Sequence, residues 1–228
     1  MTRPFVIAID GPVAAGKTTV GRMLASRIDA LFFDTGVLFR AVAHQVLAHG
    51  IDVEDRRAVG DLTASMDVEL QDECGETRLV VNGRDISEEL RTLEIDRALP
   101  SISANPDVRR ALLSLQRDIV RGRRAVVVGR DIGTVVLPDA ELKIYLDAAR
   151  DVRAKRRYEE IRERGVEIDW DTVYRDLLAR DERDSSRKHA PLTKADDAVV
   201  IDASTRDVPE VIDVIAGLVG DRGGLCHS

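Results

Sequence analysis

The stretch from Phe5 to Thr19, FVIAIDGPVAAGKTT, constrains the fold more than any other part of the sequence. Its first five residues are apolar and partly β-branched, which predicts a strand buried on both faces. After Asp10 the chain matches the pattern G-x-x-x-x-G-K-[ST], and an amphipathic helical pattern follows. A glycine-rich turn that only caps a helix is the alternative, but it leaves the lysine and the hydroxyl without a purpose.

In a loop of this pattern, backbone N–H groups surround a triphosphate, because the glycines let the chain wrap closely around it. Lys17 then carries a positive charge to the β- and γ-phosphates, and the Thr18 hydroxyl is a ligand for Mg²⁺. We therefore predict a nucleoside triphosphate site, with Thr18 as the metal ligand. The predicted donor-binding residues are Gly11, Pro12, Val13, Ala14, Ala15, Gly16, Lys17, Thr18 and Thr19.

Composition narrows the class of protein. A chain of 228 residues with 44% hydrophobic and 33% charged residues is typical of one globular domain, with or without insertions. The net charge of −7 argues against a general nucleic-acid binder. Cys74 and Cys226 show no metal spacing, and there is no signal peptide or long apolar run. We expect a cytoplasmic monomer with no nucleic-acid or membrane partner.

Strand and helix patterns alternate along the chain, which predicts an α/β fold with a parallel sheet flanked by helices. The stretch at about 62–96 differs, because VELQDECGETRLVVNG reads as an antiparallel hairpin with a second turn after it. We interpret this stretch as an insertion. The predicted strands are 5–9, 31–33, 125–128, 142–146 and 197–201, and the predicted helices are 18–29, about 36–49, 106–121, 151–164, 170–185 and 208–219.

Ligands of parallel sheets bind at the carboxyl ends of the strands. This rule selects Asp10 with its loop, Asp34-Thr35-Gly36, Gly129-Arg130-Asp131 and Asp147. Arg130 is suited to a bidentate phosphate contact, although a structural Arg–Asp pair is an equally good interpretation. Further arginines share helix faces, and for each of them a solvated face is the simpler alternative. They include Arg153, Arg156 and Arg157 on one predicted helix, and Arg180 and Arg187 on another.

Several motifs together resemble the bacterial cytidylate kinases, or (d)CMP kinases. They are IDGPVAAGKTT, FDTGVLFR, VNGRDISEELRT, NPDVRRALLSLQR, VVVGRDIGTVVLPDAELKIYLDA and RDERDSSRKHAPL, and they span about residues 5–202 in the family's order. The phosphate loop occurs in many enzymes, whereas GRDIGTVV-x-PDA and D-[ST]-G-x-x-[YF]-R are specific to this family.

The resemblance implies a three-layer P-loop kinase that transfers the γ-phosphoryl group of ATP to CMP or dCMP with Mg²⁺. It implies one domain over 1–228, with a monophosphate-binding insert at about 62–96 and a short lid at about 151–168. Lys17, Arg130, Asp131, Arg153 and Arg157 are then the catalytic residues, the last two from the lid. The implied CMP contacts are Thr35, Arg40, Ser101, Arg109, Arg130, Asp131, Arg180, Asp184 and Arg187.

Three positions depart from the family pattern. Phe39 stands where tyrosine is frequent, Val13 replaces a frequent serine, and Pro100 occupies the place of a serine that contacts the nucleotide. Ser101 either takes over that contact or the contact is absent. The preference among CMP, dCMP and UMP stays open for this reason. Two other functions also stay open: a kinase for another small acceptor, such as AMP or a shikimate-like molecule, and a nucleotide-binding regulator without catalysis.

Overall fold

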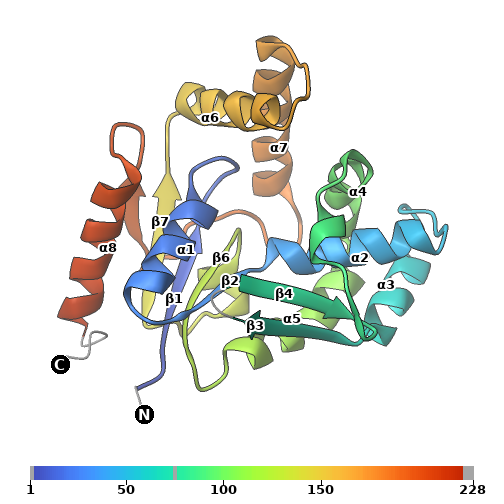
Figure 1. Cartoon of the computed structure of the whole chain (residues 1–228), viewed down its shortest axis with the longest axis horizontal. Coiled ribbons are helices and arrows are strands. Elements are labelled where there is room, and N and C mark those ends of the chain that lie inside the picture. Colours follow the sequence, from blue (N-terminus) through green and yellow to red (C-terminus); the bar gives the residue numbers. More distant parts are fainter. Residues whose placement is uncertain (1–2, 74–75, 223–228) are drawn as a thin grey trace. The chain divides into compact units, whose positions relative to one another are not determined.

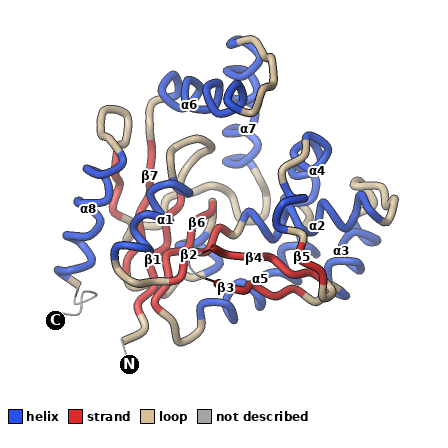
Figure 2. The backbone as a smooth tube through the Cα atoms, in the orientation of Figure 1, coloured by secondary structure: helices blue, strands red, loops and turns tan. Residues whose placement is uncertain are grey.

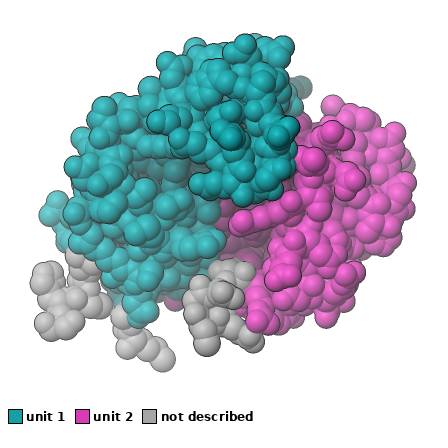
Figure 3. Space-filling model, turned by 45° about the horizontal axis from the view of Figure 1, so that its top comes forward, with its two compact units in different colours: residues 1–32, 123–228 teal, residues 33–122 magenta. Residues whose placement is uncertain are grey.

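The computed structural model describes residues 3–73 and 76–222. The chain divides into two compact units (Figure 3). The first unit contains Met1–Phe32 and Arg123–Ser228, and the second contains Phe33–Gly122. Because the phosphate-loop sequence and the charged helices at 151–164 and 170–185 all belong to the first unit, much of the predicted site lies within one unit.

A five-stranded parallel sheet in the order β2-β6-β1-β7-β8 confirms the predicted α/β class. Central strand β1 pairs in parallel with β6 on one side and with β7 on the other, so that Ile7 lies opposite both Val126 and Leu142. The strands are β1 Phe5–Asp10, β2 Leu31–Asp34, β6 Arg124–Gly129, β7 Leu142–Asp147 and β8 Val199–Asp202.

Strand β8 begins two residues later than the sequence pattern predicts. Asp197, the predicted first residue, instead lies before the strand, where its carboxylate accepts a hydrogen bond from Lys143 Nζ at 2.9 Å. The aliphatic stem of Lys143 is buried and its ammonium is paired with this carboxylate. The ion pair therefore fixes the entry to the strand.

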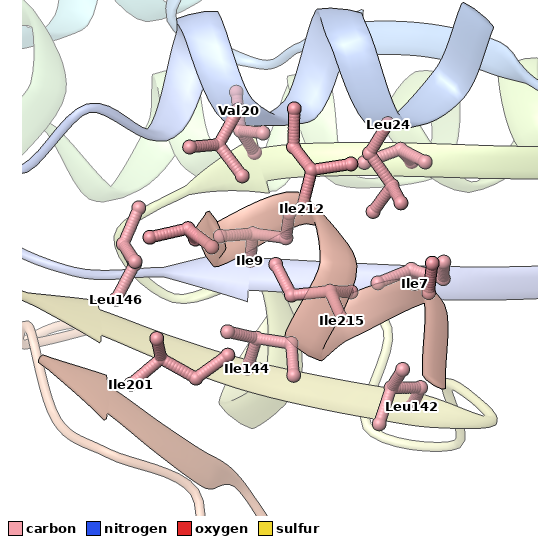
Figure 4. Packing of buried hydrophobic residues seen from close by; sticks show 14 of the residues in the cluster. Ile7, Ile9, Val20, Leu24, Leu142, Ile144, Leu146, Ile201, Ile212 and Ile215 are labelled. Atoms are coloured by element: carbon pink, nitrogen blue, oxygen red, sulfur yellow. The ribbon is translucent and has the colours of Figure 1, made fainter. Parts of the chain in front are cut away.

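The core of the first unit lies between the sheet and two helices, α1 Lys17–Arg27 and α8 Val208–Asp221. Alternate residues of β1 and β7, such as Ile9 and Ile144, point to this face (Figure 4). They meet Leu24 of α1 and Ile215 of α8, both fully buried. Burying one such side chain contributes about 1.5–3 kcal/mol, so this layer holds the phosphate loop on a rigid base.

Strand β7 runs directly into helix α6 Arg150–Glu163, which is followed by α7 Trp170–Ser186 (Figure 1). Trp170 joins the two helices through an edge contact with Tyr158 and a stacked contact with Tyr174. A short π-helix, η2 Ile132–Val136, follows β6 and was not predicted.

The second unit contains four helices and a small antiparallel sheet (Figure 2). The sheet has the order β3-β4-β5 and confirms the predicted hairpin, whose turn at Cys74-Gly75 lies outside the described residues. The second predicted turn is present at Asn82-Gly83, where both residues have positive φ angles. The strands are β3 Val68–Glu73, β4 Glu76–Val81 and β5 Arg84–Asp85, and the helices are α2 Gly36–Ala48, α3 Arg56–Ser65, α4 Leu93–Ala104 and α5 Pro106–Val120, with a 3-10 turn at Ser87–Leu90.

Helices α3 and α4 were not predicted. Pro100 lies inside α4, where a proline ordinarily disfavours a helix because it lacks the N–H donor. Burial of Ile95, Leu99 and Ile102 on one face of α4 offsets this cost. Tertiary packing therefore overrides the local signal here.

Among the described residues, none of the helices combines the length and the apolar character that crossing a membrane requires. Cys74 and Cys226 lie outside the described residues.

Candidate active site

The phosphate loop leaves β1 at Asp10 and enters α1 at Lys17. Gly11 has a φ of 152°, and a Cβ atom added there would lie 2.0 Å from the carbonyl oxygen of Leu146. Ala14 and Gly16 also have positive φ angles, of 58° and 98°. A left-handed alanine is costly and persists only where its surroundings hold it. The loop therefore has the close-wrapped backbone that the sequence predicts.

Lys17 is buried in this loop, and its Nζ donates a hydrogen bond to the carbonyl of Pro12 at 2.6 Å. The N-cap residue of α1 is Gly16, which has no side chain to bind the first N–H groups of the helix. Those N–H groups and the positive end of the helix dipole favour an anion at this place. An ammonium, a helix N-terminus and a tightly wrapped backbone together fit a polyphosphate.

Thr18 follows Lys17 on the first turn of α1 and is exposed. Its hydroxyl is an oxygen ligand of the kind that Mg²⁺ binds. Mg²⁺ ordinarily takes one or two protein ligands and completes its shell with water and substrate phosphates. Within residues 3–73 and 76–222, there is no group of three or more His, Cys, Asp or Glu side chains placed to hold a metal ion. The donor set present thus fits an ion that arrives with a nucleotide.

Asp10 joins the end of β1 to the segment after β6. Its two carboxylate oxygens accept hydrogen bonds from the backbone N–H groups of Ile132 and Gly133, at 2.8 and 2.7 Å. Burial raises the pKa of Asp10 to about 6, against the lowering effect of these two bonds, and the negative charge of Asp131 adds to the rise. This carboxylate therefore fixes the start of η2, immediately after Arg130 and Asp131.

Arg130, Asp184 and Arg187 form a compact group, which the sequence predicted as acceptor contacts. Arg130 Nε donates to Asp184 Oδ2 at 3.0 Å, and Arg187 NH2 lies 3.4 Å from Asp184 Oδ1. Their side chains are only 20%, 14% and 10% exposed. One carboxylate thus holds two guanidinium groups, with their planar sets of donors, close together.

The other acceptor residues of the first unit lie close to this group in the chain. Asp131 is buried and is the N-cap residue of η2. Arg180 is half-buried on α7, one helical turn before Asp184. Arg180 and Asp184 lie one turn apart on α7, as their spacing predicts. Arg187 lies just beyond the helix, because α7 ends at Ser186 and Arg187 is its C-cap residue.

The two predicted lid arginines differ in their surroundings. Arg157 is 26% exposed and pairs with Glu160 at 2.8 Å on the same helix. Arg153 is only 3% exposed, and its guanidinium donates to Ala148 O, Val13 O and Asp181 Oδ2 at 2.9, 3.2 and 2.7 Å. The contacts of Arg153 are therefore with the protein itself, including the phosphate loop.

In the second unit, Thr35 and Arg40 belong to the start of α2. Thr35 is the buried N-cap residue, although its side chain makes no capping bond to the helix. The Asp34 carboxylate accepts a hydrogen bond from the N–H of Gly36 at 3.0 Å, at the start of the same helix. Arg40 donates to Leu90 O and to Asp96 Oδ1, at 3.0 and 2.7 Å.

Ser101 and Arg109 lie on α4 and α5 of the same unit. The Ser101 hydroxyl donates to a carboxylate oxygen of Glu54. Arg109 NH1 donates to Ser103 O at 3.0 Å, and its guanidinium carbon lies 5.4 Å from the ring centroid of Phe39. Phe39, one of the departures from the family pattern, thus supports Arg109 by a cation–π contact that needs no hydroxyl.

Asp181 and the contacts of Arg156 were not predicted. Asp181 is the charged partner of Arg153, and Arg156 donates to Ala15 O in the loop and to Ala203 O. The face shared by Arg153, Arg156 and Arg157 was visible as a helical spacing, but the spacing gives no information about a partner 28 residues further along the chain. The pairing depends on how α6 and α7 pack, which is a tertiary property.

Comparison with known sequences gives the family. The sequence profile of the family described as "Cytidylate kinase" matches residues 7–220. The cytidylate kinase of Halalkalibacterium halodurans is 39% identical over 216 residues, which cover 95% of this chain and 97% of that protein. The cytidylate kinase of Geobacillus kaustophilus is 40% identical over 224 residues, with 98% and 100% coverage.

The fold also has a solved counterpart. An uncharacterized protein from Eubacterium ventriosum matches with a TM-score of 0.54 and 14% sequence identity, over 95% of this chain and 98% of that one. This likeness concerns the fold alone. The family assignment comes from the profile and the relatives, whose coverage extends over nearly the whole chain. With its phosphate loop, parallel sheet and arginine-rich helices, the chain belongs to the cytidylate kinase family.

Proposed function

We propose that this protein is a (d)CMP kinase that transfers the γ-phosphoryl group of ATP directly to CMP or dCMP. The products are ADP with CDP or dCDP, and no covalent enzyme intermediate forms. In phosphoryl transfer, the protein contributes mainly by positioning the two nucleotides and neutralising charge. Membership of the family and the distribution of cationic side chains support this function.

The observation that carries the proposal is the group Arg130, Asp184 and Arg187. It lies in the same unit as the phosphate loop, and two guanidinium groups are held there by one carboxylate. A protein that only bound ATP would have no use for a second, separate phosphate site. A monophosphate acceptor uses such a site, because its phosphate must be fixed for in-line attack.

On the donor side, Lys17 and the N–H groups of residues 11–19 bind the ATP phosphates. The Nζ of Lys17 exchanges its bond to Pro12 O for phosphate oxygens as the nucleotide enters. Mg²⁺ bound with ATP supplies further neutralisation of phosphate charge, and Thr18 offers it a hydroxyl ligand. The triphosphate is then surrounded by the loop residues Gly11, Pro12, Val13, Ala14, Ala15 and Gly16.

On the acceptor side, we assign the roles that the family resemblance implies. Arg130 and Arg187 bind the phosphate of CMP, and Arg180 and Asp184 bind the sugar. Thr35 and Arg40 are contacts of the monophosphate substrate. Asp131 and Arg109 read the cytosine edge, and Ser101 replaces the serine that is absent at position 100. Arg109 is held by Ser103 O and Phe39, so it is ordered before the acceptor binds.

Helix α6 supplies the lid. The ion pair of Arg157 with Glu160 is partly exposed, and such pairs contribute only about 0–1 kcal/mol, so Arg157 can leave it for the transferred phosphate at little cost. Closure of this segment would exclude water, which otherwise hydrolyses ATP. We propose that residues 1–228 form one domain, with an insert at about 62–96 and a lid at about 151–168. We also propose that the protein is a cytoplasmic monomer.

The direct test is product formation. Purified protein with Mg²⁺, ATP and CMP is expected to produce CDP and ADP in equal amounts, as measured by chromatography of the nucleotides. A nucleotide-binding regulator would bind ATP without forming CDP. That result, with a protein shown to be folded and to bind ATP, would rule out the kinase.

A further inference from the structure

Side chains from α6 bind the outer carbonyl groups of the phosphate loop. Arg153 NH1 donates to Val13 O at 3.2 Å, and Arg156 NH1 donates to Ala15 O at 3.4 Å. In a planar trans peptide, the C=O and the following N–H point in opposite directions. A carbonyl held from outside therefore turns the next N–H, that of Ala14 or Gly16, towards the other side of the peptide plane.

The first of these N–H groups belongs to Ala14, whose backbone conformation needs support, and the second belongs to a glycine. Ala14 and Gly16 have φ angles of 58° and 98°, in the region that L-residues rarely adopt. A left-handed non-glycine residue persists only where the surrounding structure fixes it. The bond from Arg153 to Val13 O supplies that support at the peptide unit before Ala14, and the bond from Arg156 to Ala15 O fixes the peptide unit before Gly16.

Arg153 is itself held rigidly. It is 3% exposed, and each nitrogen of its guanidinium has an acceptor: Ala148 O for Nε, Val13 O for NH1 and Asp181 Oδ2 for NH2. Ala148 directly follows β7, so the sheet and α7 both fix this side chain. A guanidinium used on all three nitrogens is placed to position the loop.

The two oxygens of the Asp181 carboxylate differ in their hydrogen bonding. Its Oδ2 accepts from Arg153, whereas its Oδ1 is buried and has no hydrogen-bond partner among the described residues. Burying half a carboxylate unpaired is unfavourable. Asp181 is thus the charged partner that the buried Arg153 needs, and it fixes the direction of that guanidinium.

We propose that Asp181 is a positioning residue for ATP binding, which acts through Arg153 on the backbone of the phosphate loop. Arg156 also binds the loop, and its guanidinium is fixed by a hydrogen bond of 2.8 Å to Ala203 O. This inference rests on the proposed function, because it assigns the ATP phosphates to that loop. It gives Arg153 a role in presetting the loop before ATP arrives, in place of a direct contact with the transferred phosphate.

The test is Asp181→Asn, which keeps the size of the side chain and removes its charge. The dissociation constant of the Mg²⁺ complex of AMP-PNP, a non-hydrolysable ATP analogue, is measured by calorimetry without CMP. We expect it to rise about tenfold, since the bond to a buried guanidinium loses its charge assistance. The dissociation constant of CMP is expected to stay within about twofold, because its contacts are not made by the loop.

Glu159→Gln is the matched control. Glu159 lies on α6 and pairs with Lys155 at 4.0 Å on an exposed face. Removing this pair takes a carboxylate from the same region without touching the loop, so both dissociation constants are expected to equal those of the unsubstituted protein.

Three results would overturn the inference. Asp181→Asn with unchanged AMP-PNP affinity would show that the loop needs no such support. Equal weakening of AMP-PNP and CMP would show a general loosening. A fall in kcat with unchanged AMP-PNP affinity would show that the residue acts only in the transition state. Asp181→Glu, which restores the charge, is expected to recover part of the affinity.

If Asp181→Asn does not fold, Arg153→Lys tests the same contacts, because it keeps a positive charge beside Asp181 but removes the planar guanidinium that reaches Val13 O. Weaker AMP-PNP binding with unchanged CMP binding supports the inference, and unchanged binding of both contradicts it. Failure of the proposed function is distinguishable, since it would appear in the unsubstituted protein as binding without CDP formation.

Discussion

The ammonium group of Lys17 is buried at the base of the phosphate loop, 2.6 Å from Pro12 O. A buried ammonium is costly unless it is paired, and a carbonyl is a weaker partner than a phosphate. The side chain is thus held in place for an anion and gains a stronger interaction when one binds.

Lys17→Ala is expected to lower kcat/KM for ATP by about 100-fold or more, because a positioned charge on the transferred phosphate is lost. The free energy of unfolding is expected to change little, since removing a costly buried charge offsets the loss of its hydrogen bond to Pro12 O. Steady-state kinetics and urea unfolding check both parts. Lys155→Ala, at an exposed position of α6, is the control.

A Lys17→Ala variant with a near-normal rate and a normal fold would contradict the assignment of the loop as the donor site. A variant that does not fold would contradict the second part of the prediction, that the lysine serves binding more than stability.

Asp10 gives a pH prediction whose sign is opposite to that of most carboxylates. Burial raises its pKa from 3.8 to about 6 in the folded state. The neutral form is therefore favoured by folding, and the stabilising contribution is present below the unfolded pKa and is lost as pH rises through 6. Relative to Asp10→Asn, the protein should lose about 2 kcal/mol of unfolding free energy between pH 4 and pH 7.5.

Urea unfolding of both proteins across this range measures the difference. Asp197→Asn is the control, because Lys143 holds the pKa of Asp197 below its usual value, and its contribution is lost only in more acidic solution. Between pH 5 and 7.5, the difference in unfolding free energy between the unsubstituted protein and Asp197→Asn should stay constant. If the difference in unfolding free energy between the unsubstituted protein and Asp10→Asn also stayed constant, burial would not raise the pKa of Asp10.

At the scale of elements, the sequence was sufficient where a pattern is local. The apolar run of β1, the phosphate loop and the hairpin β3–β4 all appeared as expected. Helix α4 was missed because it contains Pro100, which argues against a helix, whereas packing stabilises it. The π-helix η2 was missed because it depends on the hydrogen bonds that the N–H groups of Ile132 and Gly133 donate to Asp10.

The packing of α1 on the sheet gives a prediction at this scale. A Cβ atom added to Gly21 would lie 2.6 Å from Val128 Cγ1 and 2.9 Å from Phe32 Cε2. Gly21→Ala must push the helix from the sheet or displace both side chains. We expect a loss of about 1–3 kcal/mol in the free energy of unfolding, as for other overpacked cores.

Gly217→Ala on α8 is the matched control, since a Cβ added there meets no atom within 4 Å among the described residues. It should raise the free energy of unfolding by about 0.5–1 kcal/mol, because alanine loses less entropy in a helix. Urea unfolding compares the two. Equal stability of Gly21→Ala and the unsubstituted protein would contradict the close contact of α1 with β6.

At the scale of the whole molecule, the predicted site residues are distributed over both units. The first unit contains the phosphate loop, Arg130, Asp131 and the arginines of α6 and α7, whereas the second contains Thr35, Arg40, Ser101 and Arg109. Motifs identified these residues because each motif is local. Their partners, such as Asp181 for Arg153 and Asp96 for Arg40, come from distant positions that no spacing reveals.

The acceptor distinguishes a cytidylate kinase from other kinases with the same loop. The departures at Val13, Phe39 and Pro100 leave the reaction class intact but bear on the base and sugar preference. Arg109 and Asp131 are the residues assigned to the cytosine edge, and discrimination by such polar contacts is strong, because a wrong base leaves them unpaired.

The most direct test is therefore kcat/KM for CMP, dCMP, UMP, AMP and shikimate, measured side by side with saturating Mg²⁺ and ATP through ADP release. CMP and dCMP are expected to give the highest values, with AMP and shikimate at the background rate of ATP hydrolysis. A higher kcat/KM for AMP or shikimate than for CMP would contradict the assignment of this protein as a (d)CMP kinase.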